Sequence, residues 1–109
     1  MLEPRILLMD EPFSAVDALT RAILQELILN IWRTIPVTIL FVTHDVEEAV
    51  FLSSRIISLT KSPARIHEDV AIDLPYPRDQ ITTRAEPKFH ALRQQLFASI
   101  FLQEKGVAP

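Results

Sequence analysis

The sequence of 109 residues contains no cysteine, one glycine and no long apolar run. The absence of cysteine excludes disulfide bonds and thiolate metal sites. The single glycine is Gly106, so these residues contain no glycine-rich loop of the kind whose backbone N–H groups wrap nucleotide phosphates. No apolar run approaches about 18 residues, and no charged segment followed by an apolar one resembles a secretory leader. We therefore expect a chain that does not enter a membrane by itself.

Charge and apolar content narrow the class of protein further. The chain has 11 Lys and Arg against 14 Asp and Glu, for a formal net charge of −3. A nucleic-acid binder is expected to carry a basic patch instead, so this class is disfavoured. Hydrophobic residues make up 49% of the sequence, which is enough for a core. The length corresponds to one domain at most.

Two adjacent carboxylates near the start are the first candidate functional residues. Asp10 and Glu11 directly follow the apolar run from Ile6 to Met9, and Pro12 comes next. An unbroken apolar run predicts a strand that is buried on both faces, as in a parallel sheet covered by helices, and proline cannot continue its hydrogen-bond ladder. The acids are therefore expected at the carboxyl end of a central strand, where ligands bind in open α/β sheets. Taken alone, the two acids are equally compatible with a plain strand end.

A second apolar run, from Val37 to Thr43, ends directly before His44. The residues between the two runs predict a helix over 18–34, with Asp17 as its N-cap and one apolar stripe facing the sheet. This stripe consists of Leu24, Leu27, Ile28, Ile31 and Ile35. Strand, helix and strand predict a parallel βαβ unit that delivers the acids and His44 to the same edge of one sheet.

Four further elements are expected after His44. Asp45 and Glu48 have the spacing of a capping box, which predicts a short helix over 46–52. Residues 55–59 form a third strand, and residues 64–74 form a loosely alternating edge strand of a hairpin. The last element is an amphipathic helix from about Pro87, with Phe89, Leu92, Leu96, Ile100, Phe97 and Phe101 as its expected core residues.

Three short motifs in this order resemble those of the ATP-binding subunits of ABC transporters. Ile6-Leu7-Leu8-Met9-Asp10-Glu11-Pro12 resembles the Walker B motif, Ser14-Ala15-Val16-Asp17 the D-loop, and Thr43-His44-Asp45 the segment with the switch histidine. The family usually has leucine where Val16 stands. Each motif alone is weak, but the three together, at this spacing, are specific.

The resemblance implies a role for each candidate residue. Asp10 would hold Mg²⁺ through a water molecule, and Glu11 would be the general base for the attacking water. His44 would sense the γ-phosphate of ATP, and Ser14 and Asp17 would lie at the contact with a second ATPase subunit. The two other histidines, His67 and His90, have no acidic or cysteine partners at ligand spacing, so a zinc site is not expected.

The resemblance covers residues 1 to about 101 and also indicates a subfamily. Residues 41–52 and 72–78 look like the ATPase subunits of importers for nitrate, sulfonate, taurine and similar small solutes. Such subunits work with two permease subunits at the inner, cytoplasmic face of the cell membrane, as peripheral membrane proteins. The resemblance therefore implies ATP and Mg²⁺ as ligands, a permease and a second ATPase subunit as partners, and transport-coupled ATP hydrolysis.

The family's Walker A loop, Q-loop and signature motif have no counterpart in these residues. We therefore expect the fold to be α/β, the C-terminal half of a P-loop NTPase domain. Residues 1–60 would form the core with the three motifs, residues 61–80 the edge strands and a proline-rich connection, and residues 81–109 the C-terminal helix and tail. In this fold the strand that leads into Walker A lies between the second and third strands of the chain. The sheet is thus expected to have a gap there. The chain would then be poorly stable alone, close the gap by rearrangement, or complete its sheet with another chain or a second copy.

Two readings of function remain open from the sequence. In the first, the chain is part of an ATP-hydrolysing importer subunit and binds ATP weakly or not at all alone. In the second, it is a non-enzymatic truncated protein that pairs with an intact ATPase subunit, or an inactive remnant. The start of the chain bears on this choice, because residues 1–4 resemble the interior of the family's domain.

Overall fold

The computed structural model describes residues 5–60 and 63–106, which form a small α/β structure. The expected lead-in at residues 1–4 and the turn at residues 61–62 lie outside these residues. The elements are β1 (Ile6–Asp10), α1 (Ala18–Thr34), β2 (Thr38–Val42), α2 (Val46–Leu52), β3 (Arg55–Leu59), β4 (Ile66–Ala71) and α3 (Pro87–Glu104). All expected elements are present, and the largest differences in bounds are at β4. None of the described helices is long and apolar enough to cross a membrane.

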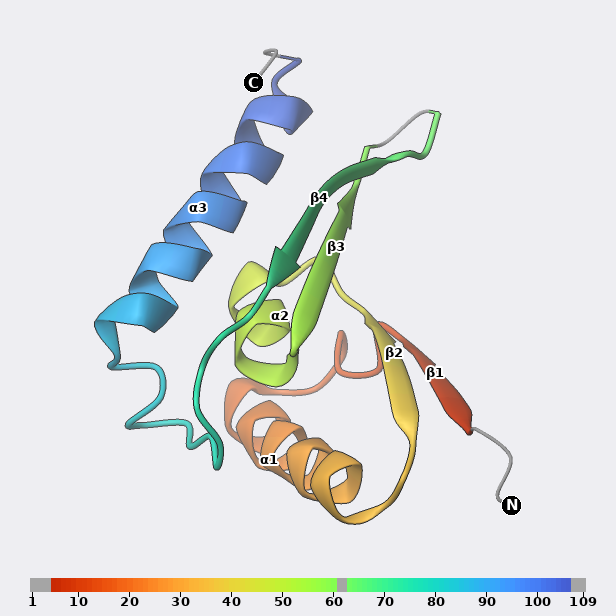
Figure 1. The fold of residues 1–109 in the computed structure, drawn as a ribbon, viewed down its shortest axis with the longest axis vertical. Helices are drawn as coiled ribbons and strands as arrows, with labels where there is room; N and C mark the ends of the chain where they lie inside the picture. Colours follow the sequence, from red (N-terminus) through yellow and green to blue (C-terminus); the bar gives the residue numbers. More distant parts are fainter. Residues whose placement is uncertain (1–4, 61–62, 107–109) are drawn as a thin grey trace.

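The strands form two separate pairs rather than one sheet. β1 and β2 are parallel, in a register that runs from Ile6 opposite Thr38 to Asp10 opposite Val42. β3 and β4 are antiparallel and form the expected hairpin. Among the described residues β2 and β3 are not paired, and the two pairs diverge from one another in Figure 1. The expected gap between the second and third strands is therefore confirmed.

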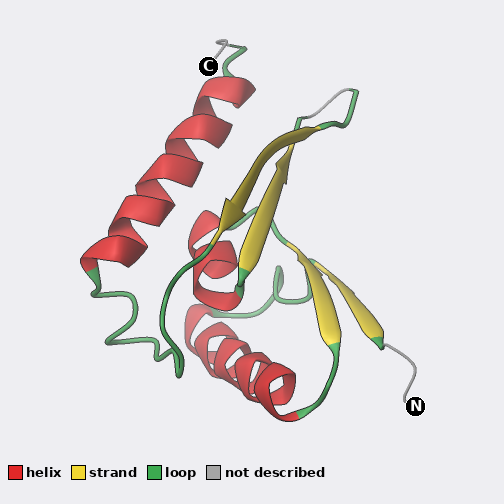
Figure 2. Ribbon diagram, in the orientation of Figure 1, coloured by secondary structure: helices red, strands yellow, loops and turns green. Residues whose placement is uncertain are grey.

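The helices cover only one face of the strands. In Figure 2 the three helices lie to one side of both strand pairs. Exposure alternates along β2, so that Phe41 packs against the core while Leu40 is 57% exposed. The prediction that β1 is buried on both faces is wrong, because Leu8 is 62% exposed and only Met9 is partly covered. A second covering layer, which such a strand requires, is missing from the described residues.

The buried face of α1 also differs from the prediction. Gln25 and Leu29 are its buried residues; Gln25 is hydrogen-bonded to Glu48 of α2, and Leu29 belongs to the hydrophobic core. Three members of the predicted stripe, Leu27, Ile31 and Ile35, are exposed. The stripe was assigned from apolar spacing alone. A buried polar residue such as Gln25 cannot be recognised from spacing, because its burial depends on partners that lie elsewhere in the chain.

The core lies around α2, between α1 and α3. Val50 and Phe51 of α2 are fully buried, as are Phe89 and Leu96 of α3. The predicted inward face of α3 is thus confirmed for these two α3 residues. Two other predicted core residues of α3, Phe97 and Phe101, are about half exposed and stack on each other with ring centroids 5.8 Å apart. Phe97 borders a hollow that is also lined by His44 and by Val46 and Glu47 of α2.

Arg78 connects three segments through backbone carbonyl groups. Its guanidinium donates hydrogen bonds to the carbonyl oxygens of Phe51 and Ser53 at the C-terminal end of α2, at 3.0 and 2.7 Å. It also donates to Ile72 and Leu74, in the segment after β4, at 3.3 and 3.2 Å. The last carbonyls of a helix lack partners within the helix, and a cation there is favoured by the helix dipole. Burial lowers the pKa of Arg78, but a guanidinium stays charged at neutral pH.

We predict that Arg78→Lys lowers the free energy of unfolding by about 2–4 kcal/mol, because one ammonium group cannot reach both sets of carbonyls and leaves buried oxygens unpaired. Urea unfolding followed by the fluorescence of Trp32, the single tryptophan, measures this. Arg55→Lys is the matched control, because the pair of Arg55 with Asp69 is exposed to solvent. Equal unfolding midpoints for Arg78→Lys and the parent chain contradict the prediction.

Candidate functional site

The parallel pairing of β1 with β2 brings the two strand ends together. At the end of β1, the Glu11 backbone N–H donates to the Val42 carbonyl at 2.8 Å. Glu11 then turns away in the left-handed region, with φ of 49°. This conformation costs a residue other than glycine on the order of 1 kcal/mol and is concentrated at functional sites. The turn directs the Glu11 side chain toward the residue that follows β2 and Thr43.

That residue is His44, whose ring contacts Glu11 directly. His44 Nδ1 lies 2.5 Å from Glu11 Oε1. The His44 side chain is 93% exposed, whereas that of Glu11 is 31% exposed. An ionised carboxylate only accepts hydrogen bonds, so Nδ1 carries the proton in this contact. In a neutral ring Nε2 is then an acceptor, and it becomes a donor only when the ring is an imidazolium.

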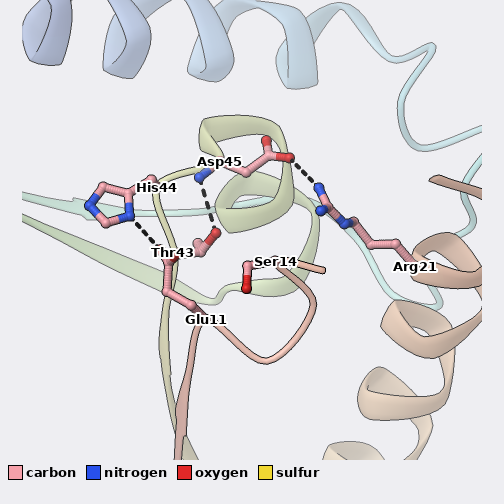
Figure 3. Close-up of a pocket in the computed structure, with 6 residues that line it drawn as sticks. All are labelled: Glu11, Ser14, Arg21, Thr43, His44 and Asp45. Atoms are coloured by element: carbon pink, nitrogen blue, oxygen red, sulfur yellow. Dashed lines mark hydrogen bonds and ion pairs between the residues drawn. The ribbon is translucent and has the colours of Figure 1, made fainter. Parts of the chain in front are cut away.

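A cavity of about 320 Å³ is formed where these residues meet. It is lined by Glu11, Ser14, Arg21, Thr43, His44 and Asp45 (Figure 3). The structure thus brings together three residues predicted from the sequence, Glu11, Ser14 and His44. Arg21, by contrast, was not predicted. It donates to the Phe13 carbonyl at 2.8 Å and to Asp45 at 3.3 Å, and so ties the turn after β1 to the start of α2.

Asp10 and Asp17 do not line this cavity. Asp10 is an exposed residue at the end of β1. Asp17 is the N-cap of α1, as predicted, and accepts a hydrogen bond from the Thr20 backbone N–H at 3.2 Å. Hydrogen bonds from the Thr20 hydroxyl and backbone N–H hold the pKa of Asp17 below its usual range. Only the capping role of Asp17 is therefore visible in the structure.

The described residues contain no group of three or more His, Cys, Asp or Glu that could hold a metal ion. A single carboxylate such as Asp10 nevertheless suits Mg²⁺, which keeps several waters and is usually bound by one or two carboxylates together with substrate phosphates. His67 is hydrogen-bonded to Ser99 at 2.9 Å, and His90 packs edge-on against Phe89.

Next to the cavity-lining residue Thr43 lies the buried Glu48 side chain, whose hydrogen bonds the sequence motifs did not predict. Asp45 accepts from the Glu48 backbone N–H at 3.2 Å, so the first half of the predicted capping box is confirmed. The second half is wrong, because the Asp45 backbone N–H donates to Thr43 Oγ1 instead. The Glu48 side chain turns inward and accepts from Thr43 and Gln25. No short pattern in the sequence indicates this arrangement, because Gln25 and Glu48 lie 23 positions apart.

Comparison with known proteins finds relatives across nearly the whole chain. No protein-family model matches. The chain is 44% identical over 101 residues to a putative ATP-binding protein of Brucella abortus, a match that covers 93% of this chain and 38% of the relative. It is 48% identical over 94 residues to the aliphatic sulfonates import ATP-binding protein SsuB of Bacillus licheniformis, which covers 86% of this chain and 35% of the relative.

A third relative is the nitrate transport protein NasD of Klebsiella oxytoca, which is 44% identical over 105 residues, or 95% of this chain and 39% of the relative. The chain is a homologue of ABC ATP-binding subunits. It spans little more than a third of the length of the curated relatives that it matches. This share is consistent with the expected correspondence to a C-terminal part of such a subunit.

We predict that the neutral ring of His44 carries its proton on Nδ1, and that Glu11→Ala returns it to the tautomer mixture of a free imidazole. The reason is that the alanine offers no acceptor to Nδ1. Ring ¹⁵N chemical shifts measured by NMR distinguish the two tautomers. His67 and His90 are internal controls in the same spectrum, and Glu86→Ala is the matched control variant. A His44 ring protonated on Nε2 in the parent chain contradicts the assigned contact.

Proposed function

We propose that this chain is one part of the ATP-binding subunit of an ABC importer, in which Glu11 and His44 act on the terminal phosphate of ATP. The observation that carries the proposal is the contact between these two residues across the ends of two parallel strands. The names of the relatives, an import ATP-binding protein and a nitrate transport protein, support the same function. In this proposal residues 6–12 are the Walker B motif, residues 14–17 the D-loop, and His44 the switch histidine.

The proposed fold is part of a P-loop NTPase domain. The open edges of β2 and β3 support this, because one more strand between them would join the two pairs into a single sheet. The exposed apolar residues of the strands, such as Leu40 and Ile57, would then be covered by a second layer. The strand, and the phosphate-binding loop that follows it in this fold, come from residues outside the 109. We propose the same division of the chain as the sequence indicated, at about residues 60 and 80.

The residues of the site support separate steps of hydrolysis. Glu11 is placed to accept a proton from the attacking water as a general base. His44 Nε2 points away from the Glu11 contact and can meet a phosphate oxygen, to which it donates only as an imidazolium. The proton on Nδ1 stays with Glu11 while the pair is closed, so Glu11 must release His44, or use its second oxygen, to accept the water's proton. When bound with the nucleotide, Mg²⁺ would neutralise phosphate charge, with Asp10 as its water-mediated ligand.

The remaining features of the assembly follow from the same proposal. The subunit would lie at the cytoplasmic face of the membrane, bound to permease subunits, and would energise the uptake of a sulfonate, nitrate, taurine or a similar small solute. Ser14 and Asp17 would contact a second ATPase subunit. The open strand edges could also pair two copies of this chain.

Phosphate release from ATP tests the proposal directly. We predict hydrolysis when this chain is mixed with a separately expressed amino-terminal half of a related sulfonate-import ATP-binding protein. Glu11→Gln should lower the rate about 100-fold or more, because an amide cannot take a proton from water. Glu86→Gln is the matched control, since the Glu86 side chain makes no capping hydrogen bond.

An unchanged rate with Glu11→Gln contradicts the assigned role of Glu11. A stable complex of the two halves that does not hydrolyse ATP favours the alternative function, in which the chain only pairs with an ATPase subunit.

A further inference from the structure

We infer that Gln25 and Glu48 are positioning residues that hold His44 against Glu11. This inference rests on the proposed function for its importance to the reaction, but not for its test. Neither residue lines the cavity, and the sequence indicated no role for Gln25 and only a helix-capping role for Glu48. Both are nevertheless almost completely buried, with Gln25 2% and Glu48 4% exposed.

The Glu48 carboxylate is fully engaged beneath the site. Oε2 accepts from Gln25 Nε2 at 2.7 Å, and Oε1 accepts from Thr43 Oγ1 at 2.8 Å. No described cation forms an ion pair with it. A buried carboxylate is costly unless its oxygens are hydrogen-bonded, so loss of either donor is expected to disturb the group as a whole.

Thr43 links the Glu48 side chain to the backbone next to His44. Its hydroxyl donates to Glu48 and accepts from the Asp45 backbone N–H at 3.0 Å. Asp45 in turn caps the Glu48 backbone N–H. The residues on both sides of His44 are therefore tied to Glu48. The exposed ring of His44 has only Glu11 as a hydrogen-bond partner among the described residues, so its place depends on this backbone.

Gln25 is itself held in one orientation. Its Oε1 accepts from Gln80 Nε2 at 2.8 Å and from Arg84 Nη2 at 3.2 Å. The opposite end, Nε2, must then face Glu48, because a flipped amide would set its NH₂ group against two donors and its oxygen against a carboxylate. A chain of hydrogen bonds thus runs from the segment before α3, through Gln25 and Glu48, to the residues beside His44.

In this series of hydrogen bonds Gln25 donates and Glu48 accepts, so exchanging the two side chains is a test. Gln25→Glu sets two carboxylates against each other. In Glu48→Gln the amide can instead turn its NH₂ group toward Thr43 Oγ1, which also accepts hydrogen bonds, so this substitution is needed only for the double variant. The double variant, which carries both substitutions, restores every donor and acceptor. Its carboxylate at position 25 accepts from the new amide at position 48 and from Gln80 and Arg84, while the amide oxygen at position 48 still accepts from Thr43. The measurement is the ring ¹⁵N signature of His44 that reports a proton on Nδ1.

We expect Gln25→Glu to lose the His44 signature and the double variant to regain it. Leu29→Ala, which opens the same buried face of α1 one turn away, is the control for general loss of stability and should keep the signature. Thr43→Val removes the hydroxyl link but keeps the branched shape, and should lose it. This variant decides the question if a single variant at the buried positions does not fold.

The inference is overturned if folded Gln25→Glu or Thr43→Val keeps the signature, or if the folded double variant lacks it. The readout requires no nucleotide. The two mixed halves could fail to hydrolyse ATP while the His44 signature is lost in Gln25→Glu and regained in the double variant. In that case the proposed function is wrong and the positioning role stands.

Discussion

The candidate site depends on the parallel pairing of β1 with β2. Glu11 and His44 are separated by 33 positions in the chain, and the register that places Asp10 opposite Val42 is what brings them into contact. In a parallel pair both strands end at the same edge, so residues that follow the two strands meet there. A shift of one residue would turn the side chains of one strand to the opposite face and separate the pair.

The strand ends are held in place mainly by contacts around α2, because the described strands do not form one complete sheet. The core gathers around α2, and Arg78 fixes the C-terminal end of this helix to the segment that follows β4. At the other end of α2, Glu48 ties its first turn to Thr43. The strands contribute little to this core, and their outer faces remain apolar and exposed.

Local signals in the sequence predicted the elements well. The caps at Asp17 and Asp45, the proline at the start of α3 and the spacing of apolar residues located every helix, and the gap between β2 and β3 followed from the family resemblance. The burial of β1, of the Leu27 side of α1 and of Phe97 was predicted wrongly. Each of these depends on which element lies opposite, and this is a tertiary property that spacing does not contain.

Part of the candidate site could also be predicted from the sequence. Glu11, Ser14 and His44 follow strand ends, so motif and topology together placed them at one edge. Arg21, Gln25 and Glu48 act through partners that are distant in sequence, and no short pattern reveals such partners. Their roles became apparent only from the contacts themselves.

We propose that the chain holds the water-activating and phosphate-sensing residues of an ATPase but not its phosphate cradle. Calorimetric titration with Mg-ATP tests this most directly, first with the chain alone and then with the chain mixed with the amino-terminal half of a related import ATP-binding protein. We predict no saturable heat for this chain alone, and saturable binding for the mixture beyond that of the amino-terminal half alone. Saturable binding of Mg-ATP by this chain alone, unchanged in the mixture, would contradict the account.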